Sequence, residues 1–144
     1  GPPPLLDGAE ELVHQAHMSG MQVWAVTGSS DASLRSRLAQ HFRGLIDESR
    51  VIIGEDTHSG KPSAEPYLLA CARASIHPHN AIAVENAPLG IRAADQAGVF
   101  CIAVNTGPLD SLVLESSGAR AVFSGCKQLA ELWREVLAVL RPYE

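Results

Sequence analysis

The sequence predicts an α/β fold in which a parallel sheet is covered by helices on both faces. Helical and strand patterns alternate along the 144 residues almost without exception. The expected strands are apolar throughout, which is typical of strands buried on both faces. Single expected helices separate them, and this order favours parallel pairing through helical crossovers. The length suits one domain, so we expect a single Rossmann-like domain over residues 1–144.

The first expected helix begins near Asp7. Glu10 lies three positions later, which is the spacing of a capping box. Leu12 and Val13 belong to an apolar stripe at helical spacing, and Gly20 is a typical residue to end a helix. The pattern therefore predicts one amphipathic helix over residues 7–20, ahead of the first strand.

An apolar run at residues 23–26 is bounded by the polar sequence Thr-Gly-Ser-Ser at 27–30. This pattern predicts a buried strand that ends in a polar loop. The second helix is expected over residues 31–42, with an apolar face formed by Leu34, Leu38 and Phe42. Residues 51–53 then form a second short strand.

A polar loop over residues 54–60 leads to the third expected helix. Ser63 can cap this helix, and Pro66 is tolerated in its first turn. Its buried side consists of Tyr67, Leu68, Cys71 and Ala72. The sequence His-Pro-His-Asn at 77–80 breaks the chain, and the apolar run at 81–84 is the third strand.

The last third of the chain continues the alternation. Pro88 begins a helix that Gly98 closes. The remaining expected elements are a strand at 99–104, a short helix at 108–116, a strand at 121–123 and one final helix that carries Leu129 through Leu140. The sequence thus predicts five strands and six helices.

The amino-acid composition argues against nucleic-acid and membrane partners. The formal net charge is −5 and the sequence pI is about 5.6, and no basic face is visible, which argues against a nucleic-acid binder. No polybasic patch is present, and no apolar run approaches the ~20 residues that span a bilayer, so we expect no membrane partner.

The N-terminal residues and the cysteines bear on the cellular location of the protein. The chain opens with Gly-Pro-Pro-Pro at 1–4, which is unlike a signal peptide and also resembles the scar of tag removal. Cys71, Cys101 and Cys126 form no C-x-x-C pair and are odd in number, which argues against a disulfide framework or a zinc site. We therefore expect buried, reduced thiols in a cytoplasmic protein.

Ligands of an open parallel sheet bind beyond the carboxyl ends of its strands, so the residues at those ends are the candidates for chemistry. Thr27 follows the first strand, and its hydroxyl together with the N–H groups of Gly28 and Ser29 could hold a phosphate oxygen near a helix N-terminus. The alternative is that Ser29, Ser30 or Asp31 caps the following helix.

Lys61 is the second candidate, because a compact ammonium suits a phosphoryl group. The alternative is a solvated lysine in a loop. Residues 54–61 resemble a P-loop only superficially, since the spacing is one residue too long and Pro62 stands where a magnesium-binding Ser or Thr belongs.

The third candidate is the pair Glu85 and Asn86 at the end of the third strand. The carboxylate could bind Mg²⁺, which favours carboxylates together with substrate phosphate. The alternative is a pair that orders the loop before Pro88.

Taken together, these segments resemble three motifs of the haloacid dehalogenase-like hydrolases. Val-Thr-Gly-Ser-Ser at 26–30 is similar to the second motif, Gly-Lys-Pro at 60–62 to the third, and Val-Glu-Asn-Ala-Pro-Leu-Gly-Ile-Arg-Ala-Ala at 84–94 to the fourth. The resemblance covers nearly the whole chain, from about Leu5 to Leu140, and lies nearest the branch of beta-phosphoglucomutase and small sugar-phosphate phosphatases.

The resemblance implies an aspartate that attacks the phosphoryl group of a small phosphorylated metabolite, a sugar phosphate above all, with Mg²⁺ as cofactor. Thr27 would bind the phosphoryl oxygens, Lys61 would stabilise charge on the nucleophile and the phosphate, and Glu85 with Asn86 would hold the metal. The family often has Asp where this chain has Asn86, so the site would carry one negative charge fewer.

The first family motif, Asp-x-Asp-Gly-Thr/Val, is absent. Asp7-Gly8 is a superficial candidate without a preceding apolar strand. The chain therefore resembles the C-terminal part of the family's core, without the first strand, the nucleophile and the cap domain, and we expect it to be inactive alone. An inactive, truncated interaction module and a fragment from expression or proteolysis are the alternatives.

In the family the absent strand lies between the strands expected here at 23–26 and 81–84. Its absence would leave two unpaired edges and an apolar slot. A separate polypeptide could supply the strand, two copies could associate, or the strands could close up into a smaller sheet.

Overall fold

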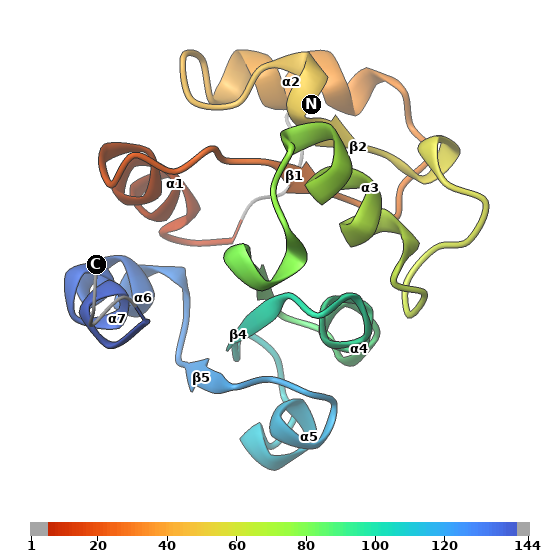
Figure 1. Ribbon diagram of the computed structural model, residues 1–144. Coiled ribbons are helices and arrows are strands. Elements are labelled where there is room, and N and C mark those ends of the chain that lie inside the picture. The colour runs from red at the N-terminus through yellow and green to blue at the C-terminus, as the bar shows by residue number, and fades with distance from the viewer. Residues whose placement is uncertain (1–5, 141–144) are drawn as a thin grey trace.

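The computed structural model describes residues 6–140 (Figure 1). Its chain alternates helices and parallel strands, as the sequence predicts, and forms a Rossmann-like α/β core. The Gly-Pro-Pro-Pro opening at 1–4 and Leu5 lie outside the described residues.

The five expected strands are all present among the described residues, and the first, second and fourth are shorter than expected. They are β1 (Ala25–Val26), β2 (Val51–Ile52), β3 (Ile82–Glu85), β4 (Phe100–Val104) and β5 (Ala121–Phe123). Residues 101–104 of β4 are all buried although their side chains alternate between the two faces, so both faces of the sheet are covered.

The described α-helices number seven rather than the expected six. They are α1 (Ala9–Met18), α2 (Ser33–His41), α3 (Glu65–Ala74), α4 (Pro88–Ala97), α5 (Ser111–Ser116), α6 (Cys126–Glu131) and α7 (Trp133–Leu140). The expected final helix is divided because Leu132 leaves helical geometry, with φ −99° and ψ 10°. Within residues 6–140, no helix combines the length and apolarity that a membrane span requires.

The predicted capping box at Asp7 and Glu10 is wrong. The N-cap of α1 is Gly8, with φ 82° and no side-chain cap. A Cβ at Gly8 would lie 2.5 Å from the backbone nitrogen of Lys127. The start of α1 therefore packs closely against the first turn of α6. This close approach, together with the left-handed backbone, selects glycine at the start of the helix.

The strands form two separate parallel sheets. β1 pairs with β2 in a two-stranded sheet, where Ala25 lies opposite Val51. β3, β4 and β5 form the other sheet in that order. β1 and β3 do not pair with each other in the described chain, so the strands do not close up into one smaller sheet.

Three apolar clusters hold the layers together. One lies between the three-stranded sheet and α3, α4 and α5, and includes Ile91 and Leu114. The second lies on the other face, against α1, α6 and α7, and includes Leu129 and Trp133. The third joins α2 to β2 and includes Phe42. Figure 1 shows α4 and α5 on the opposite side of β4 and β5 from α6 and α7.

Three 3₁₀ turns complete the described chain. They are η1 (Glu48–Arg50), η2 (Gly54–Asp56) and η3 (Pro78–Asn80). In η2 the Asp56 carboxylate accepts the N–H of Ile53 at 2.8 Å and pairs with Arg35 of α2. This contact ties the loop after β2 to α2.

Candidate active site

A cavity of about 660 Å³ separates β1 from β3. The backbone segments 22–28 and 80–86 form its two sides, and helical side chains close its two faces. The first face is lined by Leu12, Val13, Ala16 and Trp133, and the other by Tyr67, Ala70, Cys71 and Ala74. The cavity thus lies where the sequence predicts an apolar slot.

Lys61 lies at the carboxyl ends of both strands that flank this cavity. Its Nζ donates to the carbonyl of Val26 at 3.1 Å and to Oε1 of Glu85 at 2.6 Å. The ammonium also lies 5.5 Å from the ring centroid of Tyr67. The side chain of Lys61 is only 19% exposed, so the alternative of a solvated loop lysine is wrong.

Glu85 is the last residue of β3, and its carboxylate is buried. Lys61 and the Tyr67 hydroxyl both donate to the same oxygen, Oε1. A buried carboxylate costs free energy unless such partners compensate it. A Cβ at Gly90, in the first turn of α4, would overlap this carboxylate, so the helix N-terminus approaches it closely.

Tyr67 is a site residue that the sequence reasoning placed only among the buried side chains of its helix. Its hydroxyl donates to Glu85. Burial and the neighbouring Glu85 raise the pKa of Tyr67 well above its usual 10, so it stays a hydrogen-bond donor. A buried tyrosine hydroxyl normally needs a partner, and this requirement is the signal that could have identified it.

Cys101 of β4 lies near the same carboxylate. Burial, with a further effect from Glu85, raises the pKa of its thiol to about 12. The thiol is therefore protonated at neutral pH, and it does not supply a nucleophile. All three cysteines are buried and unpaired, as the sequence predicts.

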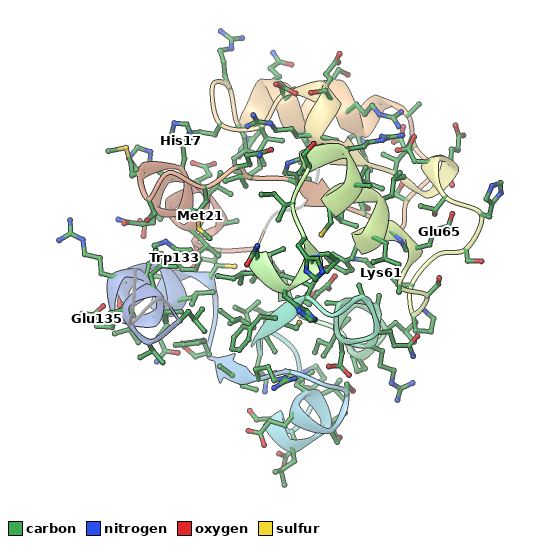
Figure 2. The ribbon with its side chains drawn as sticks, in the orientation of Figure 1. His17, Met21, Lys61, Glu65, Trp133 and Glu135 are labelled. Carbon is green, nitrogen blue, oxygen red and sulfur yellow. The ribbon has the colours of Figure 1, made fainter. Side chains whose placement is uncertain are left out.

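Glu65 fixes the loop that carries Lys61. This first residue of α3 accepts the backbone N–H groups of His58 and Ser59 through its two carboxylate oxygens, both at 2.9 Å. Ser63, the expected cap, lies one residue before the N-cap Ala64 and accepts the N–H of Glu65 at 3.2 Å. Figure 2 shows Lys61 and Glu65 on the α3 side of the molecule.

Thr27 and Gly28 line the cavity, whereas Ser29 does not. The backbone N–H of Thr27 extends the β1–β2 pairing by donating to Ile52. Its hydroxyl accepts the N–H of Ser29 at 3.1 Å, and Ser29 in turn accepts from Asp31 at 3.2 Å. The segment therefore forms a local turn before α2, and a phosphate would compete with the Thr27 hydroxyl for the Ser29 N–H.

Asn86 faces the end of β4. Its amide nitrogen donates to the Thr106 hydroxyl at 3.5 Å, two residues beyond the end of β4. Residues 6–140 contain no group of three His, Cys, Asp or Glu side chains arranged for a metal. Among the described residues, Glu85 and Asn86 are thus the oxygen ligands that this end of the cavity offers to Mg²⁺, which is usually bound by one or two carboxylates together with water and phosphate.

The geometry brings together Thr27, Gly28, Lys61, Glu85 and Asn86 around one cavity. In the described lining, Glu85 is the only carboxylate, and two donors already engage it. The arrangement can bind an anion beside an ammonium, but its lining lacks an aspartate that could attack a phosphoryl group.

Comparison with known proteins agrees with this geometry. A haloacid dehalogenase-like hydrolase family model matches residues 1–98. Validoxylamine A 7'-phosphate phosphatase of Streptomyces hygroscopicus subsp. limoneus is 36% identical over 102 residues, which are 70% of this chain and 47% of that protein. Beta-phosphoglucomutase of Bacillus subtilis is 31% identical over 108 residues, 74% of this chain and 46% of that protein.

The fold is also similar to a solved structure. A predicted beta-phosphoglucomutase from Bacteroides vulgatus superposes with a TM-score of 0.88 and 35% identity, over 96% of this chain and 57% of that one. The chain therefore spans about half the length of these relatives. By its sequence and its fold, the chain belongs to the haloacid dehalogenase-like hydrolases, in the branch of beta-phosphoglucomutase and the sugar phosphatases.

Proposed function

We propose that this chain is the phosphate-binding half of a Mg²⁺-dependent phosphohydrolase that acts on a small phosphorylated metabolite. The observation that supports this most directly is the position of Lys61 between the carboxyl ends of β1 and β3. An ammonium held in a partly buried site stabilises phosphoryl charge more strongly than one in water. Thr27, at the end of β1, would contact the phosphoryl oxygens.

The substrate class that we propose is a sugar phosphate or a similar polyol phosphate. The names of the two curated relatives, a validoxylamine 7'-phosphate phosphatase and a beta-phosphoglucomutase, both refer to phosphorylated sugar-like molecules. At the carboxyl ends of the strands the described lining offers Thr27, Lys61, Glu85 and Asn86, and Lys61 and Glu85 already pair with each other. Recognition of the sugar would therefore depend on parts of the protein outside this chain.

Glu85 and Asn86 would contribute oxygen ligands to Mg²⁺ once further carboxylates are supplied. When bound, the metal would neutralise phosphoryl charge and orient the phosphate. Tyr67 and Lys61 would keep the Glu85 carboxylate in place for that role. Without a nucleophilic aspartate, the chain alone would bind phosphate but not turn it over.

Phosphate binding tests this proposal. Titration of inorganic phosphate, followed by backbone amide NMR with and without Mg²⁺, should give saturable shifts at Gly28, Lys61 and Asn86. Lys61→Met should weaken binding about tenfold, because a charge-assisted contact is lost. The same loss of affinity in Lys127→Met, a substitution on α6, would contradict a specific role for Lys61.

Turnover is the second part of the test. Purified chain should release no phosphate from an aryl phosphate, with or without Mg²⁺. Metal-dependent turnover that disappears in Lys61→Met would mean that a carboxylate of this chain acts as the nucleophile. The proposed division of the site between this chain and another segment would then be wrong.

A second candidate is a non-catalytic interaction module, and the open cavity between β1 and β3 favours it. Phosphate binding separates the candidates, since a module that only binds a partner requires none. We also propose a cytoplasmic location, because the three free, buried thiols suit a reducing compartment.

A further inference from the structure

We propose that Gly54, the first residue of η2, is a positioning residue for the Thr27 hydroxyl. The backbone N–H of Gly54 and its lack of a side chain set the conformation of the loop at residues 28–30, and this loop fixes the hydroxyl as a donor to a phosphoryl oxygen. The phosphate contact of Thr27 rests on the proposed function. The packing of Gly54 against the loop does not.

The ladder between β1 and β2 ends in an irregular hydrogen bond. The two strands lie side by side (Figure 1), and the N–H of Thr27 donates to the carbonyl of Ile52 at 2.9 Å. A regular parallel ladder would next direct the N–H of Gly54 to the carbonyl of Thr27. It donates instead to the carbonyl of Ser29, two residues further along, at 2.7 Å. The chain therefore turns between Thr27 and Ser29, and Gly54 holds the turn.

A side chain at position 54 would need space that the loop at 28–30 occupies. A Cβ there would lie 2.7 Å from the carbonyl oxygen of Gly28 and 2.7 Å from the hydroxyl oxygen of Ser30. Contacts this short force one of the partners to move, and one of these two atoms belongs to the backbone. Glycine at 54 therefore permits the close approach of the two loops.

The loop at 28–30 is the partner that would move. Residues 51–53 are fully buried, and the Asp56 carboxylate ties the turn after them by accepting the N–H of Ile53 at 2.8 Å and pairing with Arg35 of α2. Residues 28–30, by contrast, are exposed. A segment with fewer buried contacts is displaced at lower free energy. A side chain at position 54 would therefore push the loop out of place.

The same loop determines the role of the Thr27 hydroxyl. Its oxygen accepts the N–H of Ser29 at 3.1 Å. A hydroxyl has one donor and two acceptor sites, and in the described part of the chain this one acts only as an acceptor. Its proton is therefore available to a phosphoryl oxygen in the lining that Thr27 shares with Lys61. Gly54 holds Ser29 through its carbonyl, and Ser29 holds Thr27 through its N–H.

Phosphate affinity tests this role. In a titration with inorganic phosphate followed by amide NMR, Gly54→Ala should bind roughly threefold to tenfold more weakly, because the ligand must then order the hydroxyl itself. Gly8→Ala is the matched control, since a Cβ there also meets backbone, at Lys127, but far along the chain from the loop. It should be destabilised and keep its phosphate affinity. Urea unfolding checks that both variants fold.

A double-mutant cycle separates positioning from general damage to the turn. Thr27→Val should weaken phosphate binding, and Thr27→Ser should retain most of it. In the Thr27→Val background, Gly54→Ala should have no further effect, because no hydroxyl is left to position. Ser30→Ala should restore part of the affinity of Gly54→Ala, since it removes one of the two short contacts.

The conformation of Thr27 can also be measured without phosphate. Three-bond couplings across its χ1 angle should indicate one staggered rotamer in the wild type, held by the Ser29 N–H. In Gly54→Ala the couplings should move toward the average of several rotamers, because the displaced loop no longer holds the hydroxyl.

Three results would overturn the proposal. They are unchanged phosphate affinity in Gly54→Ala, an equal loss of affinity in Gly8→Ala, and additive losses in the double variant of Thr27 and Gly54. A wild-type chain that binds no phosphate would instead remove the proposed function. The couplings would then decide alone, since an unchanged Thr27 rotamer in Gly54→Ala would contradict the positioning role and an averaged one would support it.

Discussion

At the scale of single residues, the candidate site depends on how Glu85 is enclosed. Its carboxylate lies between Lys61, the Tyr67 hydroxyl and the backbone at Gly90. Each neighbour performs a different task, since lysine supplies charge, tyrosine a neutral donor and glycine space. The three contacts can therefore be removed separately.

Gly90→Ala should destabilise the protein although alanine is the better helix former. The new Cβ would overlap the Glu85 carboxylate, and overpacking of this kind costs about 1–3 kcal/mol. The melting temperature should fall by several degrees. Gly107→Ala is the control, because a Cβ there meets nothing within 4 Å, and an equal loss in both variants would contradict the steric explanation.

Tyr67→Phe should lower the free energy of unfolding by about 1.5–3 kcal/mol, because a hydrogen bond to a charged group is lost while the ring stays. Urea unfolding measures the change. In a double-mutant cycle with Glu85→Gln the two effects should not add. Additive effects would show that the hydroxyl and the carboxylate do not act together.

At the scale of elements, the sheet edges and loops are anchored by carboxylates of the chain itself. Asp56 of η2 joins the end of β2 to α2, and Glu65 of α3 holds the loop before Lys61. Both contacts use backbone N–H groups as donors, which stabilise the ionised carboxylate and lower the pKa of Asp56 and of Glu65. The two loops should therefore depend on pH at the acidic end of the range.

Asp56→Asn should reduce the loss in the free energy of unfolding that occurs as the pH falls into the acid range. Burial raises the pKa of Asp56, but the Ile53 N–H and Arg35 outweigh it and hold that pKa below the usual 3.8. The unfolded chain then binds the proton more readily, so the stabilisation is present above pH 3.8 and is lost as the pH falls through the lower pKa of the folded state.

Chemical denaturation at a series of pH values between about 2 and 6 measures this effect, since this pH range includes the usual pKa of aspartate. Glu131→Gln, at an exposed position of α6, is the matched control. Its free energy of unfolding should depend on pH as that of the wild type does. If the free energy of unfolding of Asp56→Asn depended on pH as in the wild type, the acid sensitivity would come from other carboxylates.

At the scale of the whole molecule, the two sheets are joined mainly through helices around the cavity. The sheet of β1 and β2, apart from Val26, packs against the apolar cluster of α2, whereas β4 lies between the other two clusters. Regions with fewer buried contacts open at lower free energy. The two sheets should therefore differ in local stability.

Amide hydrogen exchange tests this difference on a matched pair. The N–H of Thr27 donates to Ile52 at 2.9 Å, and the N–H of Asn105 donates to Phe123 at 2.8 Å, each just beyond the end of a strand. The Thr27 amide should exchange about tenfold faster or more, after correction for its intrinsic rate. Equal protection would show that both sheets unfold as one unit.

Much of the fold follows from local pattern, because apolar runs and glycine or proline boundaries are local signals. The alternation predicted all five strands, and the positions of Thr27, Lys61 and Glu85 at their ends predicted which residues meet. Contacts between distant segments were missed. The pairing of Tyr67 with Glu85 and the approach of Gly8 to Lys127 depend on tertiary packing, which no local pattern records.

The contact of Glu65 with the loop before Lys61 couples the position of that loop to the position of α3. The two N–H groups of His58 and Ser59 are fastened to the first turn of the helix. Because α3 also forms one wall of the cavity, a shift of that wall would move the loop that carries Lys61. The ammonium of Lys61 is held separately, by Val26 and Glu85, so such a shift would strain the contacts at the mouth of the cavity.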